Sequence, residues 1–144
     1  HTPSSFETIF PPIRNRCKGR MFALFGSGGE RDLTKRPLQG QIAADYCDYV
    51  ILTDEDPRGE DSVELLKMIA AGAEKEGKVL DKDMFIIPDR PSAIRKAFEM
   101  AKADDIVLLL GKSHENSIIY KDRVMPYDEI STAKKIIKEL KLGE

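Results

Sequence analysis

The sequence predicts an α/β fold, a Rossmann-like three-layer domain. A mostly parallel sheet of about six strands, with one antiparallel hairpin strand, is expected between helices on both faces. Two observations predict this class. Short runs that are apolar throughout alternate with segments whose apolar residues recur at helical spacing. The length of 144 residues also suits one such domain.

Four apolar runs are the predicted strands of the sheet. They are residues 21–25, 49–53, 85–87 and 106–110. Residues 117–120 and 123–125 can pair as short antiparallel strands around a turn at Lys121-Asp122. Because wholly apolar strands separated by helices are typical of parallel sheets, the first four are expected to run in one direction.

Helices are predicted between the strands from apolar spacing and from capping residues. The predicted N-terminal caps are Ser4 or Ser5, Asp61 or Ser62, Asp89 and Asp128. Pro37 suits the first turn of the helix that follows the first strand, and Gly77 is expected to end the helix after the second. Pro11-Pro12 is expected to end the first helix early, because proline lacks the backbone N–H.

Composition limits the possible functions. The formal net charge of −2 argues against a broad basic surface for nucleic acid. No apolar run approaches the roughly 20 residues that cross a bilayer, so no membrane partner is expected. The two cysteines, Cys17 and Cys47, lack metal-site spacing and are interpreted as reduced thiols of a cytoplasmic protein. No metal site is predicted within the chain.

Charged or glycine-rich segments follow three of the predicted strands, at residues 26–36, 54–61 and 111–115. The carboxyl ends of parallel strands meet at one edge of a sheet, where α/β folds bind ligands. If the three strands are neighbours, the residues that converge are Arg31, Arg58, Lys112, His114 and Glu115. Arginines can bind carboxylates in a bidentate manner, and Asp56 with Glu115 can hold an ammonium group. The combination favours a zwitterionic ligand such as an amino acid.

Each segment also has a simpler interpretation. Gly26-Ser27-Gly28-Gly29 alone is a common strand-to-helix turn, because it lacks the spacing of both the Walker loop and the dinucleotide fingerprint. Residues 54–61 alone are typical of a solvated acidic turn in which Arg58 pairs with Glu60 or Asp61. Gly111-Lys112-Ser113 lacks the upstream glycine and the following helix of a phosphate loop. The functional hypothesis rests on the three segments together.

The combination resembles the C-terminal domain of the Mur ligases, the ATP-dependent peptide synthetases of peptidoglycan precursor assembly. It is most similar to the MurE type, which adds the third amino acid to UDP-N-acetylmuramoyl-L-alanyl-D-glutamate. The matching segments are His1-Thr2-Pro3, residues 25–32 with Lys35-Arg36-Pro37, residues 54–60 and residues 111–115. They follow the family order along nearly the whole chain, and Gly-Gly-x-Arg-Asp-x-x-Lys-Arg-Pro is the most specific of them.

The resemblance implies a division of the chain and a set of partners. Residues 1–16 would be the linker and first helix from a domain junction, and residues 17–144 the Mur ligase C-terminal domain. In the family, His-Thr-Pro ends the segment Asp-Tyr-Ala-His-Thr-Pro, which joins this domain to the central ATPase domain. The chain is therefore expected to be one domain of a longer enzyme, cytoplasmic and monomeric, and inactive without its N-terminal and central domains.

The resemblance also implies an acyl-phosphate mechanism. ATP, bound with Mg²⁺ mainly by the central domain, phosphorylates the D-glutamate carboxylate of the UDP-MurNAc-dipeptide. The amine of the incoming amino acid then attacks, giving an amide, ADP and phosphate. This domain would close on the central domain and deliver the amino acid, so its contribution would be positioning and the exclusion of water. No catalytic residue is expected within the chain itself.

Site residues are carried over by matching motifs. The residues implied for amino-acid binding are Arg31, Asp56, Arg58, Gly111 and Glu115. The residues implied to face the nucleotide are Asp32, Lys35, Arg36 and His1.

Two departures from the MurE pattern concern selectivity. Asp56 stands where diaminopimelate enzymes have asparagine, and Ser113 where the family has glycine. An aspartate favours the distal ammonium of lysine or ornithine, whereas the retained Arg58 suits the second carboxylate of diaminopimelate. The choice among these amino acids stays open. The alternatives in function are a folylpolyglutamate or cyanophycin synthetase-like ligase and a non-catalytic module that binds an amino acid or a nucleotide.

Overall fold

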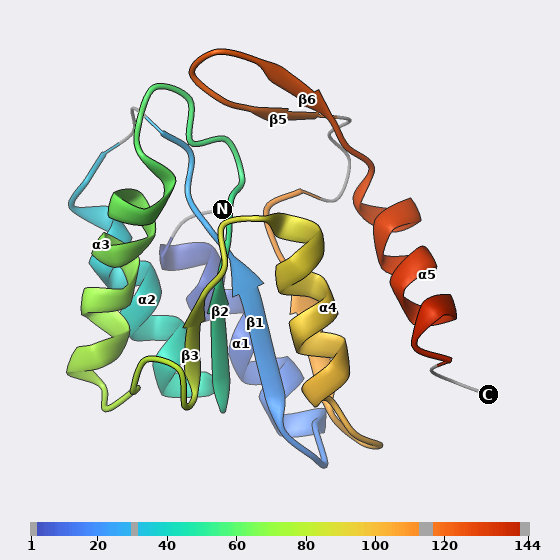
Figure 1. The fold of residues 1–144 in the computed structure, drawn as a ribbon. Helices are drawn as coiled ribbons and strands as arrows, with labels where there is room; N and C mark the ends of the chain where they lie inside the picture. The colour runs from blue at the N-terminus through green and yellow to red at the C-terminus, as the bar shows by residue number, and fades with distance from the viewer. Residues whose placement is uncertain (1–2, 30–31, 113–116, 142–144) are drawn as a thin grey trace.

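A four-stranded parallel sheet forms the centre of the computed structural model, which describes residues 3–29, 32–112 and 117–141 (Figure 1). Its strands are β1 (Met21–Phe25), β2 (Tyr49–Leu52), β3 (Met84–Ile86) and β4 (Ile106–Leu109), in the order β3-β2-β1-β4. In the register, Leu24 lies beside Ile51 on one side and Leu109 on the other. The strands that precede the three charged segments are therefore adjacent, as the sequence hypothesis requires.

Helices cover both faces of the sheet, which confirms the predicted three layers. The helices α1 (Pro3–Arg16), α2 (Lys35–Tyr46) and α3 (Ser62–Lys75) share one core with Ala23 and Phe25 of β1. The helices α4 (Arg90–Met100) and α5 (Glu129–Glu139) share the other core with Phe22 and Leu24. This alternation follows from the strand geometry, in which successive side chains point to opposite faces. Figure 1 shows α4 in front of the sheet and α1 behind it.

The predicted hairpin forms, but it does not extend the sheet. The strands β5 (Ser117–Ile119) and β6 (Val124–Pro126) pair with each other in antiparallel fashion as a separate two-stranded ribbon. Six strands are thus present among the described residues, divided into four and two, and the expectation of one sheet of about six strands is wrong on this point. Figure 1 shows the hairpin lying across the carboxyl edge of the sheet.

The first helix continues through Pro11 and Pro12 to Arg16, so its predicted early end is wrong. Burial explains the continuation, because Phe6 and Phe10 are fully buried. The Phe6 ring meets the ring of Phe25 edge-on, with 4.9 Å between centroids. Tertiary packing of this kind outweighs the loss of two helical N–H donors.

Three of the predicted caps are confirmed. The side chains of Asp61, Asp89 and Asp128 each accept a hydrogen bond from a backbone N–H in the first turn of α3, α4 and α5. Gly77, with φ of +94°, follows α3 at its predicted end. These local signals are readable from sequence because they depend on few neighbouring residues.

Candidate functional site

The loops after β1, β2 and β4 lie against one another at the carboxyl edge of the sheet. The first two are held in backbone contact, because the Gly29 N–H donates to the carbonyl of Asp56 over 2.6 Å. A Cβ on Gly26 would lie 2.0 Å from the carbonyl oxygen of Thr53, and one on Gly29 would lie 1.8 Å from that of Pro57. Only glycine fits at these two positions. The close approach of two loops therefore accounts for both glycines.

Asp56 joins the loop after β2 to the loop after β4 and to the hairpin. Its Oδ1 accepts from Lys112 Nζ at 2.7 Å and from the Ile119 N–H at 2.9 Å. The Lys112 side chain is 1% exposed, and that of Asp56 is 20% exposed. Among the described residues, none donates to Oδ2 of Asp56. One oxygen of this carboxylate is thus used within the fold, and the other is available to a ligand.

Arg58 has an unusual backbone and a side chain that makes no ion pair with any residue the structure describes. Its φ of 55° lies in the left-handed region, which is uncommon for residues other than glycine. Its N–H donates to the carbonyl of Ile119 at 3.0 Å, so the hairpin fixes this conformation. Within the described ranges the guanidinium makes no ion pair, and its buried Nε has no hydrogen-bond partner. A ligand carboxylate would supply one.

The interpretation of Arg58 as the partner of Glu60 or Asp61 is wrong. Glu60 instead receives a bidentate contact from Arg36, with distances of 2.8 and 2.6 Å. Asp61 caps α3 by accepting from the N–H of Glu64. Both acidic groups are therefore committed elsewhere, which leaves Arg58 for another role.

The hairpin is fastened to the loop after β2 by a third contact. The hydroxyl of Tyr120 donates to Oδ2 of Asp54 at 2.9 Å. Burial raises the pKa of Asp54 above its usual value, although the hydrogen bond from Tyr120 opposes this effect. Burial and the same bond raise the pKa of Tyr120. The hairpin and the loop that carries Asp56 and Arg58 thus form one unit.

Glu55 was missed by the sequence reasoning, although it lies between Asp54 and Asp56. Its Oε2 accepts from the Gly26 N–H at 2.7 Å. Gly111, with φ of +97°, packs so closely that a Cβ there would lie 2.4 Å from the Glu55 carboxyl carbon. Burial raises the pKa of Glu55 to about 7, while the Gly26 hydrogen bond and the charges of Arg90 and Lys112 oppose the rise. Acidic loops usually point to solvent, so nothing in the sequence marked this carboxyl as buried.

Arg90 was also missed, and it holds two of the strand ends from the α4 side. Its fully buried guanidinium forms a bidentate ion pair with Glu129 of α5, at 2.9 and 2.7 Å. It also donates to the carbonyls of Asp54 and Leu110, at 3.0 and 2.9 Å. The hydroxyl of Tyr127 donates to Glu129 as well. This cluster therefore fixes the starts of the loops after β2 and β4 relative to α4 and α5.

Two of the residues predicted to face a nucleotide, Asp32 and Arg36, have local partners in the structure. Asp32 accepts from the N–H and the hydroxyl of Thr34 at the start of α2, and these bonds lower its pKa. Lys35 is exposed. Arg36 is fully buried and, besides Glu60, donates to the carbonyl of Gly28 at 3.2 Å. A nucleotide contact by these three stays a prediction.

Three predicted site residues, His1, Arg31 and Glu115, lie outside the described residues, as does His114. The structure does bring together Asp56, Arg58, Gly111 and Lys112, from two of the three segments. The third segment, the glycine loop, contacts them through its backbone.

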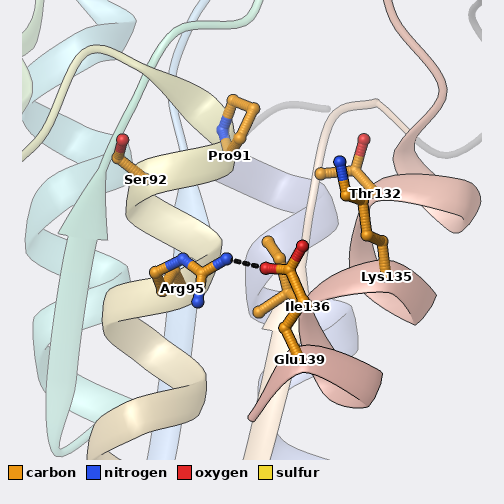
Figure 2. Close-up of a pocket in the computed structure, with 7 residues that line it drawn as sticks. All are labelled: Pro91, Ser92, Arg95, Thr132, Lys135, Ile136 and Glu139. Atoms are coloured by element: carbon orange, nitrogen blue, oxygen red, sulfur yellow. Dashed lines mark hydrogen bonds and ion pairs between the residues drawn. The ribbon is translucent and has the colours of Figure 1, made fainter.

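A pocket of about 260 Å³ lies elsewhere, between α4 and α5. Figure 2 shows Arg95 reaching across it to Glu139, with which it forms an ion pair. The lining residues are Pro91, Ser92, Arg95, Thr132, Lys135, Ile136 and Glu139. None of them comes from the three strand-end loops, so this pocket is separate from the candidate site.

In the described part of the chain, no group of three or more His, Cys, Asp or Glu side chains could hold a metal ion. Over the same residues, no helix has the length and apolar character needed to cross a membrane.

Comparisons with known proteins agree with this geometry. Residues 1–113 match the family described as "Mur ligase, glutamate ligase domain". The UDP-N-acetylmuramyl-tripeptide synthetase of Treponema denticola is 66% identical over 140 residues, which are 95% of this chain and 26% of that protein. The UDP-N-acetylmuramoyl-L-alanyl-D-glutamate–2,6-diaminopimelate ligase 1 of Clostridium acetobutylicum is 39% identical over 140 residues, which are 97% of this chain and 28% of that protein.

A solved structure of a UDP-N-acetylmuramoyl-L-alanyl-D-glutamate–2,6-diaminopimelate ligase has the same fold. It superimposes with a TM-score of 0.85 at 32% identity, covering 98% of this chain and 28% of that one. The chain thus spans about a quarter of the length of the relatives it matches. It belongs to the Mur ligase family, as the C-terminal, glutamate ligase domain of a MurE-type protein.

Proposed function

We propose that this chain is the amino-acid-binding domain of a cytoplasmic, ATP-dependent ligase. The ligase would add the third amino acid to UDP-N-acetylmuramoyl-L-alanyl-D-glutamate in peptidoglycan synthesis. The observation that carries the proposal is that the Arg58 guanidinium and one oxygen of the Asp56 carboxylate lie two positions apart and can both still bind a ligand. Among the described residues, the Arg58 guanidinium has no charged partner, and two positions away no group donates to Oδ2 of Asp56. One carboxylate and one ammonium group of an amino acid would satisfy both.

The chemistry that this domain serves is amide formation. The amine nitrogen of the incoming amino acid attacks the carbonyl carbon of an acyl phosphate, the C–N bond forms, and the bond between that carbon and the bridging phosphate oxygen breaks. Phosphate leaves with the electron pair, and the amine loses a proton. The chain's own residues would bind and orient the amino acid, a positioning effect that can remove a large part of the barrier.

ATP and Mg²⁺ belong to the proposed reaction. The described residues hold no group of three or more carboxylate, imidazole or thiol ligands for a metal ion. The proposal therefore assigns ATP and Mg²⁺ mainly to other domains of a longer protein. Asp32, Lys35, Arg36 and His1 are proposed to lie toward the nucleotide, and Arg31, Gly111 and Glu115 toward the amino acid.

The amino acid itself is proposed as a diamino acid, with meso-diaminopimelate, lysine and ornithine as the candidates. Lys112 already neutralises part of the Asp56 charge, which weakens the attraction for a distal ammonium group. Arg58 favours a second carboxylate. Both features favour diaminopimelate, which has a second carboxylate. Lysine and ornithine stay candidates because Oδ2 of Asp56 can still bind a distal ammonium group.

A substrate panel tests the proposal. The longer ligase that carries this chain would be given ATP, UDP-MurNAc-L-Ala-D-Glu and, in separate reactions, each of the three diamino acids. Amide product and ADP would be measured by mass spectrometry and a coupled assay. We expect ligation of at least one of them. Ligation only to a folate or to an aspartate polymer would support the related ligases instead, and binding without turnover would support a non-catalytic module.

A further inference from the structure

The carboxyl group of Glu55 occupies the point where three strand-end loops meet. It belongs to the loop after β2, it accepts from the N–H of Gly26 after β1 at 2.7 Å, and it fills the space beside Gly111 after β4. Its side chain is buried, since the residue is 7% exposed. The Glu55 carboxyl is therefore in contact with the loops after β1 and β4, and these contacts connect both loops to the loop after β2.

The structure requires glycine at two positions near Glu55, Gly26 and Gly111. A Cβ at Gly111 would come within 2.4 Å of the carboxyl carbon, and the φ of +97° there is one that other residues rarely adopt. At Gly26, a Cβ would instead meet the carbonyl of Thr53 at 2.0 Å. The loop after β4 can therefore approach the Glu55 carboxyl, and the loop after β1 the backbone of Thr53, only because these positions lack side chains.

Glu55 is also the neighbour of Asp56, whose carboxylate and backbone make the next contacts. Asp56 binds Lys112 through Oδ1 and the Gly29 N–H through its carbonyl. A displacement of Glu55 would move Asp56 directly, and Arg58 two residues further on. Small displacements of this kind matter, because positioning is sensitive to shifts of about 1 Å.

We propose that Glu55 is a positioning residue of the candidate amino-acid site, which fixes the loop bearing Asp56 and Arg58 against the loops that carry Gly26 and Gly111. The inference rests on the proposed function for its effect on ligation, but its contacts are independent of that function. Glu55 acts through the loops and needs no contact with the amino acid.

Steady-state kinetics of the longer ligase test the effect on the site. Glu55→Ala should raise the KM for the amino acid about tenfold or more and change that for ATP less than about twofold, because the hydrogen bond from the Gly26 N–H and the loop packing are both lost. Glu55→Gln should stay close to the wild type, since its amide oxygen still accepts from Gly26. Glu55→Asp keeps the charge but is shorter, so its KM should lie between the two. Glu64→Ala is the control, because that side chain is 70% exposed on α3.

Three results would overturn the inference. The first is an unchanged amino-acid KM in Glu55→Ala, and the second is an equal rise in the KM values for amino acid and ATP. The third is a Glu55→Gln variant more impaired than Glu55→Asp, which would make the charge the decisive property. Should Glu55→Ala not fold, the comparison of Gln with Asp decides alone.

Hydrogen exchange of this chain separates failure of the inference from failure of the proposed function. The Gly26 and Gly29 amides should exchange about tenfold faster in Glu55→Ala and at the wild-type rate in Glu55→Gln. This readout requires no ligation, so it holds even if no amino acid is a substrate. Unchanged exchange in Glu55→Ala would contradict the loop-fixing role.

Discussion

Nζ of Lys112 lies 2.7 Å from Oδ1 of Asp56, and this ion pair joins the loop after β4 to the loop after β2. The lysine is almost fully buried and the aspartate is partly exposed. A lysine so placed needs a counter-charge, because an unpaired buried charge is costly. Asp56 therefore has a structural role beside any role toward a ligand.

Breaking this pair should destabilise the chain. Lys112→Met leaves Asp56 without its cation and should lower the free energy of unfolding by about 1–3 kcal/mol. Adding Asp56→Asn should recover part of the loss, so a double-mutant cycle by urea denaturation should show favourable coupling. The exposed pair Arg123–Asp122 is the control, and Arg123→Met should cost less than about 1 kcal/mol. A loss no larger for Lys112→Met than for this control would contradict the account.

The buried ion pair of Arg90 and Glu129 gives a second prediction. Glu129→Ala leaves the Arg90 guanidinium buried at the strand ends without its carboxylate, and the expected loss is about 3–5 kcal/mol of unfolding free energy. Arg95→Ala, which breaks the half-exposed pair with Glu139 on the same two helices, is the matched control with an expected loss of about 1 kcal/mol or less. Thermal unfolding of both variants would measure the difference. Equal losses would mean that the Arg90 cluster does not hold α5 and the strand ends.

Much of the fold could be predicted because it depends on local pattern. The apolar runs located all four strands of the sheet, and aspartates located three helix starts. The hairpin was found too, but its position was not, since it is held by single contacts such as Tyr120 with Asp54. Long-range contacts of this kind leave no periodic signal. The helix through Pro11-Pro12 depends likewise on distant packing with Phe25.

The sequence indicated which residue types line the candidate site, but it did not indicate which side chains pair with one another there. The charged segments do follow neighbouring strands, and Asp56 and Lys112 of two of them are in contact. The sequence could not reveal that Glu60 would be taken by Arg36 from another helix. Nor could it reveal that Asp54 and Glu55, two carboxylates in an acidic run, turn inward while Asp56 stays partly exposed. Inward and outward side chains in a loop follow no fixed period.

Glu55 also predicts a pH dependence of stability. Its pKa is about 7 in the folded chain against 4.5 for the unfolded group, so the folded state binds the proton more tightly. Its contribution to stability is complete below pH 4.5 and is lost as the pH rises toward 7, by roughly 3 kcal/mol in total. The unfolding free energy of the wild type minus that of Glu55→Gln should therefore decrease as the pH rises over this range, as measured by urea titrations. A difference that does not vary with pH would contradict the burial of the ionisable carboxyl.

The packing of α2 on α3 depends on a glycine. A Cβ on Gly72 would lie 1.7 Å from the carbonyl oxygen of Pro37, which is backbone and cannot rotate away. Gly72→Ala should therefore separate the helices and destabilise the chain by about 1–3 kcal/mol, despite the better helix propensity of alanine. Glu74→Ala, at an exposed position of α3, is the control and should change stability by less than about 0.5 kcal/mol. A Gly72→Ala variant as stable as wild type would contradict the close approach.

Arg58→Ala in the proposed longer ligase is the sharpest test of whether Arg58 and Asp56 belong to one amino-acid site. Loss of a charge-assisted contact of about 1.5–3 kcal/mol should lower kcat/KM for the amino acid by roughly 10-fold to 150-fold. The value for ATP should change little, and Arg95→Ala, in the separate pocket between α4 and α5, should resemble wild type. If Arg58→Ala leaves the KM and kcat for the amino acid unchanged, Arg58 is not part of the site and the account is wrong.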